Sequence, residues 1–60
     1  GGAGADGVVG REGVLRHVEG ELFLEIDDDL WPVAPGSPGE PGGTAVVEEV
    51  VGGRVRVAPM

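Results

Sequence analysis

The stretch P-G-G-T-A-V-V-E-E-V-V-G-G-R-V-R-V-A-P, residues 41–59, decides the fold of this chain. Within it, Ala45 and Val47 are two residues apart, and so are Val55 and Val57. A step of two places side chains on the same face of an extended strand, while Arg54 and Arg56 point the other way. The spacing therefore predicts two paired strands.

Three further features of this stretch define how the strands pair. The step of three from Val47 to Val50 breaks the alternation, and a β-bulge in which Glu48 and Glu49 face a single partner residue would restore it and bend the strand. The pair Gly52-Gly53 supplies the positive φ values of a two-residue hairpin turn. The proline at the end of the stretch has no N–H group to donate, so we expect the pairing to end there.

Two more strands are predicted upstream, at residues 13–18 and 21–26, with Glu19-Gly20 turning the chain between them. The second has the clearest alternation in the sequence. Its aliphatic residues predict an inner face and the residues between them an acidic outer face. The aliphatic residues are Leu22, Leu24 and Ile26, and the others are Glu21, Phe23 and Glu25.

A third upstream strand is expected at residues 30–34, after a turn at Asp27-Asp28-Asp29. Aspartate favours turns because its carboxylate bonds to nearby backbone N–H groups and because it tolerates left-handed conformations. Pro32 lacks an N–H group, which predicts an edge or a bulge at that position. Residues 35–43, rich in proline and glycine, predict a stiffened surface loop with no residue suited to a core.

Five short strands without helical periodicity predict an all-β fold, a small five-stranded barrel like the oligonucleotide/oligosaccharide-binding (OB) fold. Full or partial closure of the barrel would hide strand edges that otherwise invite aggregation. We assign residues 8–60 to this domain. Residues 1–7, which read G-G-A-G-A-D-G, are expected to be a flexible N-terminal arm or linker.

Composition excludes several functional classes. The chain has 60 residues, 11 acidic residues against 4 arginines, and a formal net charge of −7. Such a charge repels phosphate backbones and argues against binding to nucleic acid. The apolar runs are far shorter than the roughly 20 residues that cross a bilayer, so no segment of this chain is expected to span a membrane.

The residue types needed for catalysis or metal binding are scarce. His17 is the sole histidine, there is no cysteine or lysine, and Ser37 and Thr44 are the only hydroxyl residues. No nucleophile and base can be assigned from this set, so we expect no catalytic residue, no cofactor and no enzymatic activity. Glu25 and the following aspartates lack the alternating spacing and central glycine of a calcium loop, so no metal site is predicted.

The two aromatic residues are the best candidates for contact with another molecule. Trp31 either fills the core or acts as an exposed binding anchor. Phe23 lies on the acidic face of its strand and is the better candidate for an outside contact. The predicted interaction surface consists of Phe23, Glu21, Glu25 and Trp31.

Several motifs resemble the C-terminal domain of NfeD-like membrane proteins. The decisive stretch is similar to that family's closing pattern, G-x-x-V-x-V-x-x-V-x-G-x-x-L-x-V-x-P. Upstream, G-R-E-G-V-L at residues 10–15 is similar to the family's opening strand, and D-D-D-L-W at residues 27–31 resembles its D-G-x-x-W hairpin. The positions that match the closing pattern are Gly42, Ala45, Val47, Val50, Gly52, Val55, Val57 and Pro59.

The resemblance implies a domain joined to transmembrane helices on its N-terminal side, on the cytoplasmic side of the cell membrane. Segments outside this chain would then make the only contact with the membrane. It also implies stomatin- or flotillin-type protein partners in membrane organisation or quality control. Longer family members carry a serine protease region, and nothing in this chain matches it.

We therefore expect a non-catalytic protein-interaction domain whose acidic exterior suits a basic partner surface. The alternative is a free-standing cytoplasmic OB-type barrel that binds a small ligand, a sugar or single-stranded nucleic acid. Nucleic acid would require basic grooves and several stacking aromatics, whereas a sugar makes no such demand.

Overall fold

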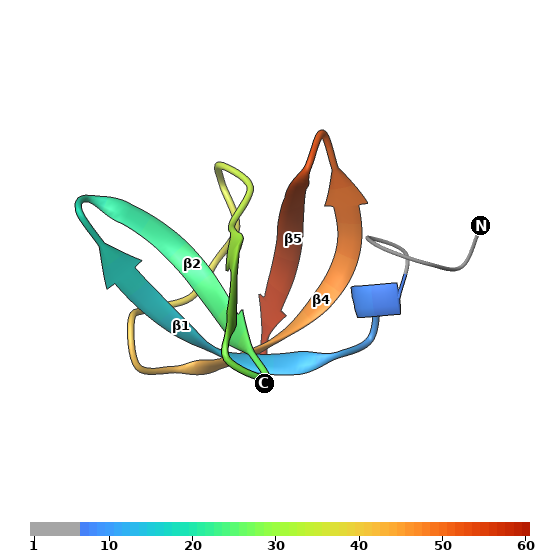
Figure 1. Ribbon diagram of the computed structural model, residues 1–60, viewed down its shortest axis with the longest axis horizontal. Helices are drawn as coiled ribbons and strands as arrows, with labels where there is room; N and C mark the ends of the chain where they lie inside the picture. The colour runs from blue at the N-terminus through green and yellow to red at the C-terminus, as the bar shows by residue number, and fades with distance from the viewer. Residues whose placement is uncertain (1–6) are drawn as a thin grey trace.

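Alternating apolar and polar side chains give an all-β fold over residues 7–60, the part of the chain that the computed structural model describes. The strands form one antiparallel sheet in the order β3-β2-β1-β4-β5 (Figure 1). Their bounds are β1 Glu12–Val18, β2 Glu21–Ile26, β3 Asp29–Pro32, β4 Thr44–Val51 and β5 Arg54–Pro59. The prediction of an all-β fold with five strands is confirmed.

The β4–β5 hairpin contains the predicted bulge. Val47 pairs with Val57 and Glu49 pairs with Arg56, which leaves Glu48 as the extra residue on β4. The Arg56 guanidinium also forms an ion pair with the Glu49 carboxylate at 2.6 Å. Because the bulge adds one residue, the valines on both sides of it stay on the inner face of the sheet.

Three two-residue turns have positive φ values at both central residues. These values are 50° and 84° at Glu19-Gly20, 48° and 70° at Asp27-Asp28, and 57° and 78° at Gly52-Gly53. This is the type I′ geometry, whose twist matches that of the flanking strands. Glutamate has no special tolerance for a left-handed conformation, so Glu19 is the strained member of the set.

Replacing Glu19 with asparagine is expected to stabilise the protein by about 0.5–1 kcal/mol, because Asn-Gly is a preferred type I′ pair. Urea denaturation followed by circular dichroism measures the change in the free energy of unfolding. Glu21→Gln removes the same charge from an exposed strand position and should have little effect. Equal gains in the two variants would mean that relief of charge repulsion, and not the turn conformation, is responsible.

The third strand differs from its prediction at both ends. It covers Asp29–Pro32 and not residues 30–34. The turn uses only Asp27 and Asp28, so Asp29 already pairs with Ile26 of β2. The strand ends at Pro32, although one more backbone bond to β2 follows it, because the Val33 N–H donates to the Leu22 carbonyl (3.0 Å).

The predicted closed barrel is not formed by the described residues. A single parallel bridge, Val33 to Val55, joins the chain after β3 to β5. Beside it, the Ala34 N–H donates to the Val55 carbonyl (2.8 Å) and the Val57 N–H to the Ser37 Oγ (3.4 Å). A four-residue β3 that ends in proline is too short to make a ladder with β5, so the sheet curls without closing.

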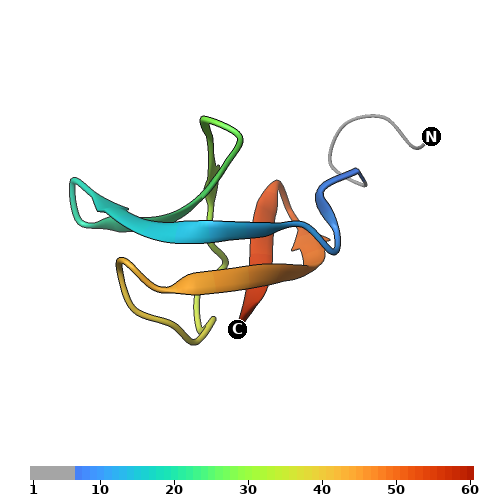
Figure 2. The same cartoon turned by 90° about the horizontal axis from the view of Figure 1, so that it is seen from below.

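Strand β1 is shared between the two halves of the sheet. Glu12, Gly13 and Val14 pair with β4, while Val14 to Val18 pair with β2. Figure 2 shows β1 and β4 running side by side, and in Figure 1 the β1–β2 and β4–β5 hairpins diverge from this shared base. A Cβ atom on Gly13 would lie 2.4 Å from the Glu25 carbonyl oxygen. The absence of a side chain therefore allows β1 and β2 to pack closely at the bend.

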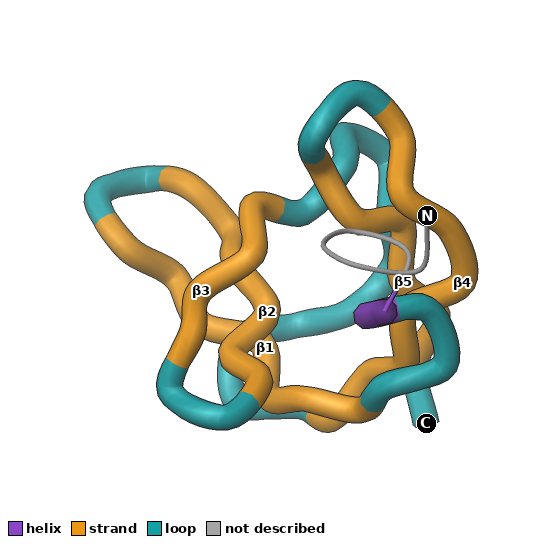
Figure 3. Tube along the Cα trace, turned by 45° about the vertical axis from the view of Figure 1, so that its right-hand side comes forward, coloured by secondary structure: helices purple, strands orange, loops and turns teal. Residues whose placement is uncertain are grey.

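The sheet is curled, as the tube in Figure 3 shows, and the core lies on its inner face. Within residues 7–60 every buried residue is apolar, and the side chains form one cluster. Leu22, Trp31 and Val50 pack against this cluster and are partly buried. The buried residues are Val8, Leu15, Leu24, Ile26, Val33, Ala45, Val47, Val55 and Val57. The aliphatic residues predicted to face inward therefore do so.

The Pro/Gly loop at residues 35–43 covers one end of the core. The Gly42 N–H donates to the Leu15 carbonyl (2.7 Å), and the Leu15 N–H donates to the Gly43 carbonyl (2.8 Å). Gly39 passes so close that a Cβ atom there would lie 2.5 Å from Leu15 Cδ1. The loop is mostly exposed, as predicted, but its backbone also seals the core over Leu15.

Candidate interaction surface and open-end pocket

The outer face of β2 carries three of the four predicted interaction residues. Glu21, Phe23 and Glu25 alternate with the inward-facing aliphatic residues of the same strand. Phe23 lies between its cross-strand partners Arg16 on β1 and Pro32 on β3. Its side chain is half-buried.

Apolar residues of three strands surround Phe23 on this face. Val14 and Leu30 are the two cross-strand partners of Glu25, and they are 39% and 47% exposed. We define the outer patch as these apolar residues together with Phe23 and two neighbours at its edge. Its members are Val14, Val18, Phe23, Leu30 and Pro32.

Acidic turns lie at both ends of the outer patch. Glu19 and Glu21 are at the β1–β2 turn, and Asp27, Asp28 and Asp29 are at the β2–β3 turn. Within the patch, the Arg16 Nε donates to the Glu25 Oε1 at 2.5 Å.

Three of the four arginines in the chain form ion pairs. Arg11 pairs with Asp27, Arg16 with Glu25 and Arg56 with Glu49. The described surface therefore keeps a strong negative charge.

Trp31 lies on the opposite face of the sheet from these residues. It pairs directly with Leu24, which is fully buried, and it packs against the core cluster. The four predicted residues therefore do not form one surface: Glu21, Phe23 and Glu25 lie together, and Trp31 is separate. Trp31 contributes to the core, which is one of its two predicted roles. Part of its side chain nevertheless remains exposed at the open end of the sheet.

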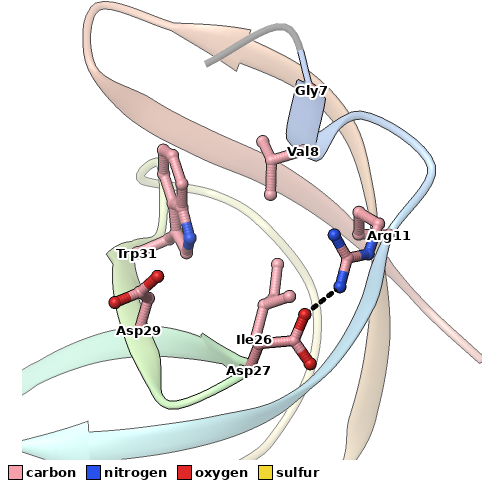
Figure 4. Close-up of a pocket in the computed structure, with 7 residues that line it drawn as sticks. All are labelled: Gly7, Val8, Arg11, Ile26, Asp27, Asp29 and Trp31. Atoms are coloured by element: carbon pink, nitrogen blue, oxygen red, sulfur yellow. Dashed lines mark hydrogen bonds and ion pairs between the residues drawn. The ribbon is translucent and has the colours of Figure 1, made fainter. Parts of the chain in front are cut away.

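The open end of the sheet contains a pocket of about 220 Å³ (Figure 4). Trp31 stands on one side and Arg11 on the other, with Val8 and Ile26 between them. Val8 and Ile26 are each 5% exposed, so they form an apolar floor. The polar groups of the pocket are Arg11, Asp27 and Asp29.

An ion pair forms one rim of this pocket. The Arg11 guanidinium donates to the Asp27 carboxylate, so a residue just before β1 is tied to the β2–β3 turn. Asp29 and Trp31 are two residues apart on β3 and therefore lie on the same face of that strand. Among residues 7–60 no cationic side chain forms an ion pair with Asp29.

The remaining polar residues lie apart from one another. His17 is an exposed residue of β1, Ser37 is in the Pro/Gly loop and Thr44 begins β4. Over the described part of the chain, no group of three or more His, Cys, Asp or Glu side chains is placed to hold a metal ion. The same residues contain no helix with the length and hydropathy of a membrane span.

The sequence did not predict the pocket, because Val8 belongs to no motif and the motif that contains Arg11 predicted only a strand. Val8 lies in a short 3₁₀ turn with Gly7, outside every predicted strand. The segment is placed by backbone bonds, since the Gly10 N–H donates to the Val47 carbonyl and the Val47 N–H donates to the Arg11 carbonyl. Six of the residues assigned to an N-terminal arm, 1–6, lie outside the described residues.

No protein-family model matches this chain, and no match was found among the curated proteins or the solved structures. The resemblance to NfeD-like proteins therefore stays a prediction from the motifs.

Proposed function

We propose that this chain is a non-catalytic protein-interaction domain that binds its partner through the outer patch. The observation that carries the proposal is a group of apolar residues on β1, β2 and β3 that surrounds the Arg16–Glu25 ion pair and is bounded by acidic turns at both ends. Apolar centres surrounded by charged rims are the usual composition of protein–protein interfaces. Phe23 is the central residue, because an aromatic side chain supplies much contact area for little loss of conformational freedom.

Charge determines the kind of partner. A chain with a net charge of −7 attracts a protein surface that carries lysine or arginine around an apolar contact. Rim charges of this kind increase the rate of association and orient the partner more than they increase affinity. Binding should therefore weaken as the salt concentration rises.

For the identity of the domain, we propose an OB-like half-barrel similar to the soluble domain of NfeD-like membrane proteins. Its partner would then be a stomatin- or flotillin-type protein on the cytoplasmic side of the cell membrane. Support comes from the motifs, from the strand order β3-β2-β1-β4-β5 and from the bridge between Val33 and Val55, which brings the two sheet edges together.

A pull-down from a native membrane extract tests this function. The wild-type chain should capture a stomatin- or flotillin-type protein, and Phe23→Ala should reduce the captured amount by about fivefold or more. Val51→Ala is the matched control, because Val51 is 51% exposed but lies on the other hairpin. Circular dichroism confirms that both variants are folded.

Two results would contradict the proposal. One is that neither type of protein is recovered with the wild-type chain, and the other is equal capture by the Phe23 and Val51 variants. Titration with RNA, DNA and oligosaccharides, followed by amide chemical shifts, tests the rival function. The interaction function predicts no response, whereas a ligand-binding barrel would show shifts across one face of the sheet.

A further inference from the structure

We propose that the open-end pocket is a receptor for a single basic side chain, lysine or arginine, of a partner protein. This inference rests on the proposed function, since the cation is taken to belong to the partner. The pocket lies on the inner face of the sheet and not on the outer patch, so it would be a second point of contact.

Size is the first argument. The volume of about 220 Å³ is below the roughly 300–1,000 Å³ that is typical of sites for drug-sized ligands. The pocket therefore suits one long side chain better than a cofactor or an oligosaccharide. Its floor of Val8 and Ile26 and its wall of Trp31 would cover the aliphatic stem that lysine and arginine both carry.

The polar groups determine the charge of the occupant. The lining contains two carboxylates, Asp27 and Asp29, and one guanidinium, Arg11, so it has an excess of negative charge. Arg11 is already paired with Asp27, and this leaves Asp29 as the carboxylate available to an incoming cation. An anionic occupant would meet both carboxylates and the field of a strongly acidic chain.

Trp31 adds a second attraction for the same kind of group. The face of an indole ring attracts ammonium and guanidinium groups through its quadrupole. Because Asp29 and Trp31 project from the same face of β3, one cation could contact both. The ion pair between Arg11 and Asp27 is an example within this chain of a guanidinium held by a carboxylate at the rim of this pocket.

The composition of the chain provides a direct readout. Trp31 is the sole tryptophan and the chain has no tyrosine, so fluorescence excited at long wavelength reports on this pocket alone. The probes are Nα-acetyl-lysinamide and Nα-acetyl-argininamide, with Nα-acetyl-norleucinamide as the uncharged control of similar shape. Titrations at constant ionic strength should show binding of the two basic probes with a Kd on the order of 1–10 mM.

A matched pair of variants tests the role of Asp29. Asp29→Asn should weaken binding of the basic probes by about three- to tenfold, because it removes the carboxylate at the pocket. Glu48→Gln removes the same charge at the β4 bulge, outside the pocket lining, and should change the Kd by less than about twofold. Circular dichroism and the single indole N–H signal in NMR spectra check that each variant is folded.

Several results would overturn the inference. These are no response to either basic probe, equal binding of the norleucine probe, or equal effects of the two substitutions. The titration uses small probes, so its failure would leave the pull-down result unaffected. A failed pull-down with a successful titration would retain the cation site and reject the proposed partner.

Discussion

Replacing Leu24 with alanine is expected to lower the free energy of unfolding by about 2–5 kcal/mol. Leu24 is fully buried, and its cross-strand partners are Leu15 on β1 and Trp31 on β3. Removal of its side chain leaves a cavity between three strands that are held in place by their ladders. A chain of this length has a total stability of only about 3–9 kcal/mol, so most of the stability would be lost.

Urea denaturation followed by far-ultraviolet circular dichroism measures this loss, and Trp31 fluorescence gives an independent probe beside the cavity. Leu30→Ala is the control, because it removes the same atoms from a position that is 47% exposed. We expect that control to change stability by less than about 1 kcal/mol. Similar losses in the two variants would mean that the curled sheet does not enclose the core around Leu24.

Local sequence signals were sufficient to predict most of this fold. Alternation predicted the inner and outer faces of β2, the step of three between Val47 and Val50 predicted the bulge, and Gly52-Gly53 predicted the tight turn. Each of these features depends on residues that are close in the sequence. The alternation also fixes the faces of strands wherever one face is buried.

Closure of the barrel could not be predicted in the same way. It depends on whether β3 and β5, which are far apart in the sequence, form a ladder. Among the described residues, the edges are joined by the single bridge between Val33 and Val55 and the bonds beside it, and they form no ladder. The short β3 was visible in the sequence, but how closely it approaches β5 depends on how far the whole sheet curls.

The candidate sites were predictable to different extents. Phe23 lies on the outer face between two glutamates because strand alternation places it there. Trp31 could not be assigned from alternation, since its role depends on Val8 and Arg11 from the segment before β1. That segment has no hydrophobic period of its own, and backbone bonds to β4 hold it in place. The pocket is therefore a product of tertiary packing.

Gly13→Ala is expected to destabilise the protein by about 3 kcal/mol or more, the upper end of the range for overpacking. Besides its contact at 2.4 Å with the Glu25 carbonyl oxygen, a Cβ atom there would lie 2.9 Å from Ile26 Cγ1 and 3.0 Å from Leu24 Cγ. The first contact is with backbone, which cannot move without breaking the β1–β2 ladder. The other two are with the core side chains of Ile26 and Leu24, which would also have to shift.

Gly53→Ala is the control that separates this clash from the general cost of replacing glycine. No described atom lies within 4 Å of a Cβ at Gly53, but its φ of +78° should cost about 1–2 kcal/mol. Urea denaturation should therefore rank the Gly13 variant as the less stable of the two. A Gly13 variant more stable than the Gly53 variant would mean that β1 and β2 are further apart at Gly13. The curvature of the sheet would then depend mainly on the bulge at Glu48.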